Sequence, residues 1–483
     1  MSATPGSPAA ESPPGADIGA RLDRLKWSPV HNAILLALGA GWLFDAFEVQ
    51  LFGNAIGPLG DYFHASFLQR DAVQAVWLAG ILLGALAGGR LADRFGRRRL
   101  FMLTLLWYAG FTFLTALSPT LVLVYAFRAL AALGVGAEYS IVNSAIAEFV
   151  PARVRGRANA FVMNFWPAGA IVAALLAFVV LNLLTVSNAM SWRYIFAFGG
   201  VIALVVLFFR RHLPESPRWL VSRGRLDEAE AIVASLEAAS GGGRRGRPAG
   251  APIERSAPSF PQAIRELVAK YPGRLALGCS LDLAEAFGYY GIFAVLSVVV
   301  LKQVHVSNVQ IPFFYIVGNV GGLAGGIAMS ANIERLGRKR TVIGFYAAAA
   351  VGVGLLAIAT STGSAVLVTG AFVISNAAAT GAWTSAYPTF TELFPTHLRG
   401  AGVGTSVAVG RIGAIVGTLA LPSIAAQIGA AFSYLLVGLF WAVGVMAMAI
   451  YSRSGGKEAS GLSLEQLVPD RNAGKMELAG RAN

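Results

Sequence analysis

Apolar stretches of about 20 residues recur along most of this chain, and each is long enough to cross the hydrocarbon core of a bilayer as a helix. The composition agrees, because 56% of the residues are hydrophobic and 13% are charged, whereas soluble proteins carry roughly 25% charged residues. We expect twelve spans, near residues 30–54, 72–92, 99–118, 120–147, 158–185, 193–210, 274–301, 309–331, 341–360, 364–390, 401–424 and 431–452. The sequence therefore predicts an all-α integral membrane protein.

The residues that build catalytic or metal centres are scarce. Cys279 is the only cysteine among 483 residues, which excludes an intrachain disulfide and a thiolate metal cluster. The five histidines show no metal-ligand spacing, and no nucleophile–base set is apparent. The net charge of +13 comes from basic residues clustered between the hydrophobic segments, a distribution that argues against nucleic-acid binding. We expect neither an enzyme nor a bound cofactor or metal.

The basic residues fall in every second loop. They form "RFGRRR" (94–99), "ARVRGR" (152–157), the stretch 210–274 and "RLGRKR" (335–340), while the intervening loops hold few Lys or Arg. Because loops rich in Lys and Arg stay in the cytoplasm, this pattern places both termini there. The even number of spans agrees with that orientation.

A long loop after the sixth span divides the chain into two halves. Apolar residues at 226, 229, 232, 233 and 236 follow helical spacing, and "GGGRRGRPAGAP" (241–252) is typical of a flexible linker. We expect five segments: a disordered cytoplasmic N-terminus (1–29), an N-terminal six-helix bundle (30–211), a cytoplasmic loop with an amphipathic helix and a Gly/Arg-rich linker (212–273), a C-terminal six-helix bundle (274–452) and a cytoplasmic tail (453–483).

The two halves repeat four landmarks in the same order. "DAFE" (45–48) returns as "DLAE" (282–285), offset by 237 residues, and "DRFGRR" (93–98) returns as "ERLGRK" (334–339), offset by 241. "EFVPARVRG" (148–156) returns as "ELFPTHLRG" (392–400), and "GAIV" (169–172) returns at 413–416, both offset by 244. Two six-helix halves related by a parallel repeat indicate a transporter that alternates access around a site between them.

These motifs resemble those of the major facilitator superfamily over about residues 20–452. "GGRLADRFGRRR" (88–99) looks like the family signature between spans two and three, and "RALAALGVGAEY" (128–139) resembles the span-four signature of sugar-porter-like members. "PESPRWL" (214–220) is shared by sugar porters and organic-ion transporters. The resemblance implies the major facilitator fold, with twelve transmembrane helices in two six-helix halves.

Other motifs point away from true sugar porters. "FDAFE" (44–48), "AFGYYGIF" (286–293) and "ELFPTHLRGAGVG" (392–404) look more like metabolite:proton symporters of the niacin, benzoate and sialic-acid type. Span seven lacks the Gln-Gln pair typical of sugar porters. One departure concerns the proton site, because the family's second acid in span one is usually Asp and here it is Glu48.

Charged residues at the cytoplasmic ends of the spans form repeated sets. Acids and arginines that pair there can hold the cytoplasmic side closed and must separate when it opens, so removing one partner shifts the populations of the two states. The alternative is that these residues only anchor the topology. We favour a cytoplasmic gate made of Asp93, Arg94, Arg97, Arg98, Glu148, Arg155, Glu334, Arg338, Glu392 and Arg399.

Two carboxylates, Asp45 and Glu48, lie in the middle of the first apolar span. A charge within a bilayer is costly, so such residues face a cavity and have partners. At roughly 1.5 Å per residue, Glu48 and Arg128 lie at matching depths in spans one and four. An acid favours its ionised form beside an arginine and its neutral form in a dry cavity without one. We expect Asp45, Glu48 and Arg128 to couple protonation to opening and closing; the alternative is a static buried pair.

Arg411 is the second informative charge, because the equivalent position of the first half is Pro167. An arginine facing the central cavity can hold a carboxylate or phosphate through two parallel hydrogen bonds. The alternative is that Arg411 neutralises an acid of span seven. The surplus of buried acids also suits a cationic substrate. We expect the substrate contacts to come from Arg411, Asp282, Glu285, Tyr289, Trp383 and Glu138.

The sequence thus predicts a multi-pass transporter of the cytoplasmic (inner) membrane, embedded in the bilayer as a monomer. It would couple protons to the import of a small organic metabolite, with an organic or aromatic acid favoured. The alternatives are a sugar, polyol or organic-cation substrate, export by proton antiport, or a membrane sensor that binds a ligand without transporting it.

Overall fold

A computed structural model describes residues 18–151, 154–184, 187–210, 213–240, 260–307, 309–395 and 398–458. In these ranges all of the regular structure is helical, as predicted. The first half contains α2 (Pro29–Tyr62), α3 (Phe67–Phe95), α4 (Arg97–Ala116), α5 (Leu121–Phe149), α6 (Arg155–Met163) followed by α7 (Phe165–Phe178), and α8 (Asn188–Arg210). The second half contains α12 (Pro272–Val295), α13 (Leu301–Gln303), α14 (Ile311–Ser361), α15 (Ala365–Leu393), α16 (Arg399–Gln427) and α17 (Ala430–Arg453). One π-helical turn extends α7 (Val179–Leu183) and another extends α12 (Leu296–Val300).

Ten helices of the described ranges are long and apolar enough to cross a membrane. One of them, α14, is 51 residues long and bends at Gly337, so it provides two spans. The helix α12 is not among the ten, because two acids interrupt its apolar residues. The ten helices, the second span of α14 and α12 together account for the twelve expected spans.

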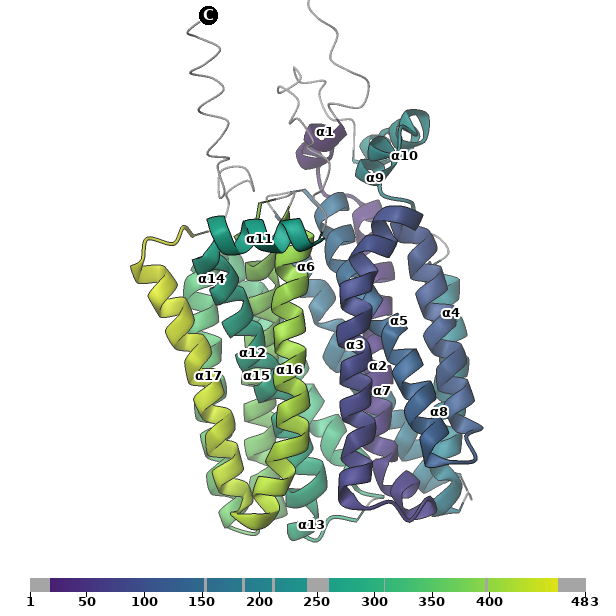
Figure 1. The fold of residues 1–483 in the computed structure, drawn as a ribbon, viewed down its shortest axis with the longest axis vertical. Helices are drawn as coiled ribbons and strands as arrows, with labels where there is room; N and C mark the ends of the chain where they lie inside the picture. The colour runs from purple at the N-terminus through teal and green to yellow at the C-terminus, as the bar shows by residue number, and fades with distance from the viewer. Residues whose placement is uncertain are drawn as a thin grey trace, which may run out of the picture.

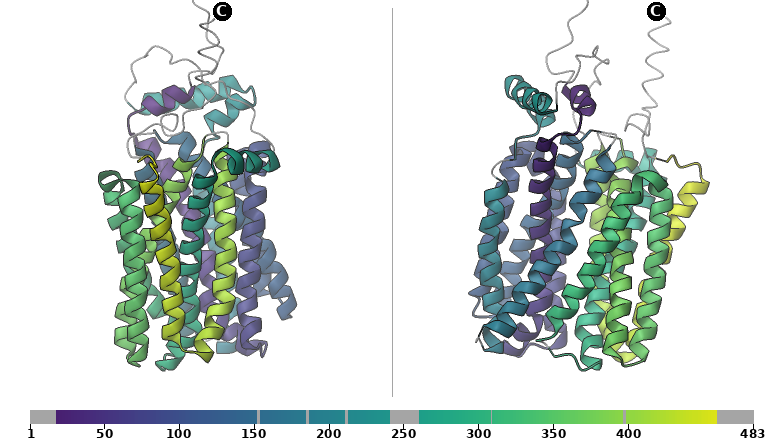
Figure 2. Two further views of the ribbon diagram at one scale, coloured as in Figure 1. Left: turned by 60° about the vertical axis from the view of Figure 1, so that its left-hand side comes forward. Right: turned by 180° about the vertical axis from the view of Figure 1, so that it is seen from behind.

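The helices form two bundles that stand side by side (Figure 1). In the first bundle α2 packs against α7 and α8, and α3 and α4 pack against α5. In the second bundle α14 packs against α15 and α17, and α12 packs against α16 and α17. The bundles meet where α3 contacts α16 and α7 contacts α14, and the view from behind shows the same division (Figure 2).

Glycines permit close helix contact inside each bundle. A Cβ added at Gly88 of α3 would lie 2.6 Å from the Cα of Ala137 in α5, and one added at Gly321 of α14 would lie 2.6 Å from the carbonyl oxygen of Val373 in α15. Both distances are too short for a side chain, so the helix backbones themselves touch. Small residues provide such contacts in membranes, where van der Waals packing takes over from the hydrophobic effect.

The repeated "GRR" and "GRK" motifs fold alike in the two halves. Gly96 separates α3 from α4 with φ +90°, and Gly337 bends α14 with φ +77°. This left-handed region is readily adopted by glycine because it lacks a Cβ. The sequence repeat therefore encodes the same sharp turn between two antiparallel spans in each half.

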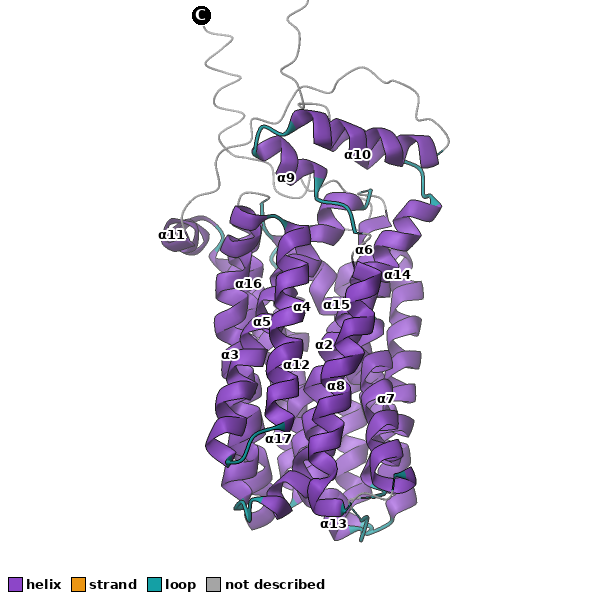
Figure 3. Ribbon diagram, turned by 90° about the vertical axis from the view of Figure 1, so that its right-hand side faces the viewer, coloured by secondary structure: helices purple, strands orange, loops and turns teal. Residues whose placement is uncertain are grey.

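Short helices cover one end of the bundles (Figures 1 and 3). They are α1 (Ile18–Arg24), α9 (Pro217–Ser222), α10 (Leu226–Ala239) and α11 (Phe260–Lys270). The helix α10 coincides with the predicted amphipathic pattern, and its buried residues are Ala229, Val233 and Leu236. The expected linker at 241–252 and the tail from residue 459 lie outside the described residues.

The prediction of a disordered N-terminus is wrong for residues 18–24, which form α1. This helix packs against α9 and α10 and buries Ile18 and Leu22. Arg21 donates two hydrogen bonds to Glu237, of 2.9 and 2.8 Å, and one of 2.6 Å to Glu230. These contacts raise the pKa of Arg21 above its ordinary value. Because its partners lie more than 200 residues away in sequence, local composition gave no sign of this helix.

Candidate functional site between the two bundles

Glu48 and Arg128 form a fully buried ion pair in the first bundle. Arg128 Nη1 of α5 donates to Glu48 Oε2 of α2 at 3.1 Å, and Arg128 Nη2 donates to the Glu48 carbonyl at 3.2 Å. The Thr112 hydroxyl of α4 donates to the same carboxylate oxygen at 2.8 Å. The guanidinium carbon lies 3.7 Å from the ring centre of Trp77 in α3. Four helices thus contribute to one pair, at the depth where the sequence placed both charges.

Asp45 lies one turn away on α2 in different surroundings. Its side chain is fully buried, and within the described residues neither carboxylate oxygen has a hydrogen-bond partner. Its charged neighbours are Glu138, Arg210 and Glu48. Asp45 is therefore a buried acid between two ion pairs, with Tyr108 among its polar neighbours.

The second of these pairs, Glu138 with Arg210, occupies a different place from the one predicted for Glu138. Arg210 of α8 donates to both carboxylate oxygens of Glu138, and Thr104 donates to Oε2 at 3.4 Å. Glu138 is not among the side chains that line the central cavity, and its expected role as a substrate contact stays a prediction. Sequence reasoning missed Arg210 because it stands next to the basic loop and was counted with the loop charges.

A small cavity lies between the two bundles. Its lining side chains are only 2–8% exposed, so the cavity is buried within the protein. The first bundle contributes Tyr139 and Trp166, and the second contributes Glu285, Tyr289, Tyr290, Trp383 and Arg411. Four of the residues expected to contact substrate therefore meet here: Arg411, Glu285, Tyr289 and Trp383.

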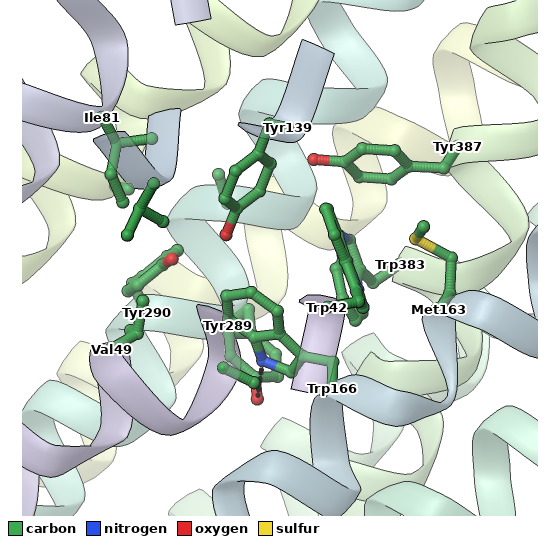
Figure 4. Close-up of a cluster of buried hydrophobic side chains, with 14 of the residues drawn as sticks. Trp42, Val49, Ile81, Tyr139, Met163, Trp166, Tyr289, Tyr290, Trp383 and Tyr387 are labelled. Carbon is green, nitrogen blue, oxygen red and sulfur yellow. Dashed lines mark hydrogen bonds between the residues drawn. The ribbon is translucent and has the colours of Figure 1, made fainter. Parts of the chain in front are cut away.

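Aromatic rings from both bundles surround this cavity and point toward one another (Figure 4). Trp42 of α2 stacks on Trp383 of α15 across the boundary, with ring centres 6.0 Å apart and planes 13° apart. Trp166 Nε1 donates to the Tyr289 hydroxyl at 3.2 Å, which also joins the two bundles. The sequence offered no reason to single out Trp42 or Tyr139, because aromatic residues in spans are common at packing and interface positions.

Arg411 is held by tyrosines. Its Nη1 donates to the Tyr290 hydroxyl at 3.1 Å and its Nη2 to the Tyr387 hydroxyl at 3.4 Å. Its guanidinium carbon lies 5.4 Å from the ring centre of Tyr139. In the described part of the chain, Arg411 has no carboxylate partner within 4 Å. Direct neutralisation by Asp282 or Glu285, the alternative left open by the sequence, is absent from this conformation.

Asp282 does not line the cavity, contrary to its expected place among the substrate contacts. It is fully buried beside Gly410 of α16, where a Cβ at residue 410 would collide with its carboxylate. Neither of its carboxylate oxygens has a hydrogen-bond partner among the described residues. The absence of a side chain at Gly410 thus leaves room for this acid between α12 and α16.

The charges expected to form the gate pair within each half. Arg97 Nη2 lies 3.0 Å from Glu148 Oε1 in the first half. In the second half Arg338 donates two hydrogen bonds of 2.8 Å to Glu392 and two, of 2.7 and 3.3 Å, to Glu334. The Glu334 and Arg338 side chains lie against Gly156 of α6, which belongs to the other half.

The remaining expected gate residues are placed as follows. Arg94 is exposed, with its guanidinium carbon 5.4 Å from the Phe95 ring centre, and Arg399 begins α16. The side chains of Asp93 and Arg155 lie outside the described residues. The backbone N–H of Arg98 donates a hydrogen bond to one of two acids near the expected gate that were not predicted from the sequence.

Those two acids, Glu215 and Glu458, cap the helices that follow the glycine turns. Glu215 accepts hydrogen bonds from the backbone N–H groups of Arg97 (2.8 Å) and Arg98 (3.3 Å). Glu458 accepts them from the N–H groups of Arg338 (2.7 Å) and Lys339 (3.2 Å). A carboxylate at a helix N-terminus satisfies unpaired N–H groups and interacts favourably with the helix dipole.

The sequence matches the sugar (and other) transporter family over residues 60–469, which is most of the chain. The niacin transporter NiaP of Acinetobacter baylyi is 31% identical over 83% of this chain and 88% of its own length. The chain belongs to this family. A probable 4-methylmuconolactone transporter of Cupriavidus pinatubonensis is 26% identical over 91% of this chain and 94% of its own length. The sugar (and other) transporter family therefore includes relatives with different substrates.

The fold agrees with this membership. A structure of the major facilitator superfamily proton:xylose symporter XylE, bound to 6-bromo-6-deoxy-D-glucose, superposes with a TM-score of 0.73. It is 21% identical in sequence and covers 90% of this chain and 98% of the symporter chain. The predicted fold class and family resemblance are thereby confirmed. As a member of the sugar (and other) transporter family, the protein is a multi-pass membrane transporter of small metabolites and not an enzyme.

Proposed function

We propose that this protein is a proton-coupled importer of a small organic acid that works by alternating access between its two bundles. The observation that carries the proposal is Arg411, a buried cation without a carboxylate partner, facing an aromatic cavity between the bundles. Orientation follows the positive-inside pattern, so both termini lie in the cytoplasm, and the membrane is the cytoplasmic (inner) one. Each monomer contains a complete site.

The substrate's carboxylate binds Arg411 in this proposal. A buried guanidinium needs an anion, and the tyrosine hydroxyls that now hold it are neutral and can reorient. The aromatic side chains around the cavity suit a ring, because flat rings pack against aromatic faces in offset or edge-on arrangements.

Protons act through Glu48, with Asp45 beside it. While Glu48 is ionised it is held by Arg128 and Thr112 in the closed first bundle. Opening a bundle to water changes that pairing, so the acid accepts a proton on one side and releases it on the other. A static pair would need no second acid, whereas Asp45 lies buried one turn away, outside the Glu48–Arg128 pair.

The cytoplasmic pairs act as the gate. Arg338 of α14 binds Glu392 of α15 and lies against Gly156 of the first half, so the contact with Gly156 is lost when the bundles separate on the cytoplasmic side. Breaking it favours the inward-open state, because an interaction made in one state only shifts the population toward the other when removed.

Relatives with other substrates support a second candidate, a sugar. The solved fold match is to a xylose symporter, and the tyrosine hydroxyls and tryptophan N–H groups of the cavity can also bind sugar hydroxyls. A sugar, however, offers no anion that could form an ion pair with Arg411. The organic acid is therefore preferred.

The test uses the purified full-length protein in liposomes on a sensor that records electrical current. Benzoate, short aliphatic carboxylates, xylose and choline are applied at several pH values, and a pH-sensitive dye inside the liposomes detects electroneutral symport of one proton with one monoanion. We expect responses to carboxylates that require a proton gradient and disappear in Arg411→Gln. Responses to xylose or choline alone would disprove the organic-acid assignment. Binding without accumulation of any compound would favour a sensor.

A further inference from the structure

The central cavity is lined by two opposite charges that do not form an ion pair with each other. Arg411 and Glu285 both line it and are each 2% exposed, yet the structure shows no ion pair between them within 4 Å in the described residues. The Arg411 guanidinium is bound to two tyrosine hydroxyls, and Glu285 Oε2 has no hydrogen-bond partner. A separated anion and cation therefore face the same enclosed space.

A buried carboxylate without a donor is unfavourable, and so is a buried guanidinium without an anion. A simple carboxylate bound at Arg411 would satisfy the cation but bring a second negative charge close to Glu285. A ligand with a donor at its other end would satisfy both groups and add no net charge to a dry site. The aromatic rings beside Glu285 favour this donor further, because a cation is attracted to the face of an aromatic ring.

We propose that Glu285 is a specificity-determining residue, which binds a protonated amine or another N–H donor of a ligand whose carboxylate contacts Arg411. The substrate class is then a ring-bearing zwitterionic monocarboxylate. This inference rests on the proposed function for the carboxylate end and adds the group at the other end.

The placement of the neighbouring acids supports the assignment to Glu285. Asp282 lies on the same helix one turn earlier, but it is directed at Gly410 and does not line the cavity. Asp45 and Glu48 belong to the first bundle, where Glu48 is already bound to Arg128. Among the described residues, Glu285 is the acid that lines the cavity with Arg411.

The experiment measures binding of matched compounds to the purified full-length protein in nanodiscs by calorimetry. The compounds are 3- and 4-(aminomethyl)benzoate, the corresponding methylbenzoates and benzylamine. We expect at least one aminomethyl compound to bind about tenfold or more tightly than its methyl counterpart, the size expected of a hydrogen bond to a charged group. In Glu285→Gln the two affinities should become equal within about twofold, while methylbenzoate still binds.

Asp282→Asn is the matched control, because it removes an acid of the same helix that does not line the cavity. It should keep the wild-type affinity ratio, whatever its effect on turnover. Arg411→Gln should lose methylbenzoate binding and retain a weak response to benzylamine. A wild-type ratio near one overturns the role of Glu285 even if the Gln variant fails to fold, and so does an unchanged ratio in a folded Glu285→Gln.

These measurements distinguish a failure of the role of Glu285 from a failure of the organic-acid function. If methylbenzoates bind and are transported but aminomethyl compounds gain nothing, the organic-acid function stands and the specificity assignment falls. If no benzoate of either kind binds while xylose does, the proposed function itself falls.

Discussion

Replacing Glu48 with Gln separates the proton-coupling role from a purely structural one. The substitution keeps the shape of the side chain and one acceptor for Thr112 or Arg128, but it removes the negative charge. We expect the variant to lose proton-driven accumulation of substrate while it still exchanges internal for external substrate, because exchange requires no net proton movement.

The structure also limits the cost to stability. A hydrogen bond to a charged group contributes about 1.5–3 kcal/mol and a neutral one about 0.5–1.5 kcal/mol, so the exchange costs about 1–2 kcal/mol. Leaving a buried partner entirely uncompensated costs about 3–5 kcal/mol. Arg128 retains its bond to the Glu48 carbonyl and its contact with the Trp77 ring, which places the expected loss below that upper range.

The assay compares two initial rates in the same liposomes. Accumulation is driven by an inward proton gradient, and exchange is measured with equal pH on both sides. Asp61→Asn is the control, because Asp61 lies on the same helix but is half exposed and pairs with Arg70 at 3.2 Å at the helix end. Accumulation by Glu48→Gln with wild-type pH dependence would falsify the coupling role and leave the pair as a static element.

Other predictions address the gate, the helix contacts and the N-terminal helix. Arg338→Met should favour the inward-open state. The readout is faster labelling of a cysteine placed at Ser330 in a Cys279→Ser background, because Ser330 accepts a hydrogen bond from Asn164 of the other half in this structure. Labelling no faster than in the parent would contradict this prediction. Gly88→Leu should lower stability in detergent by about 1–3 kcal/mol or prevent folding, since its Cβ would collide with α5. Gly110→Leu is the control and should be tolerated, because a Cβ there meets nothing within 4 Å. An equal loss of stability in both variants would refute the packing argument. Arg21→Ala should speed hydrogen exchange in α1 and α10 without slowing transport, because it removes the hydrogen bonds to Glu230 and Glu237. Unchanged exchange in α10 would show that apolar contacts alone hold α1 against α10.

The twelve spans and the repeat were readable from the sequence because both depend on local properties, namely apolar length and repeated motifs. The Glu48–Arg128 contact could also be anticipated, since the rise of a helix converts residue counts into depth. The choice between the two roles of Arg411 could not be made, because it depends on where Asp282 and Glu285 point. Both acids lie on one helix, and packing against Gly410 alone turns Asp282 away from the cavity.

The features that were missed depend on contacts between distant segments. Arg210 is an ordinary loop charge in sequence and becomes a buried partner only when α8 lies beside α5. Trp42 is one of many apolar residues of the first span, and its importance appears only in the fold, where its ring stacks on the cavity-lining Trp383 of α15. Helix α1 is stabilised by α10, with which it shares no sequence signal.

The two carboxylates that cap the glycine turns occupy corresponding places in the two halves. Glu215 lies in "PESPRWL" and Glu458 in "SGGKEAS", two stretches with no visible identity, yet each acid binds an amide that stands 118 or 120 residues before it. In both halves the segment after the last span is thereby fastened to the start of the third span. The halves therefore share the spacing of this contact although the sequences around the two acids differ. Such a correspondence is visible in the structure and not in a comparison of motifs.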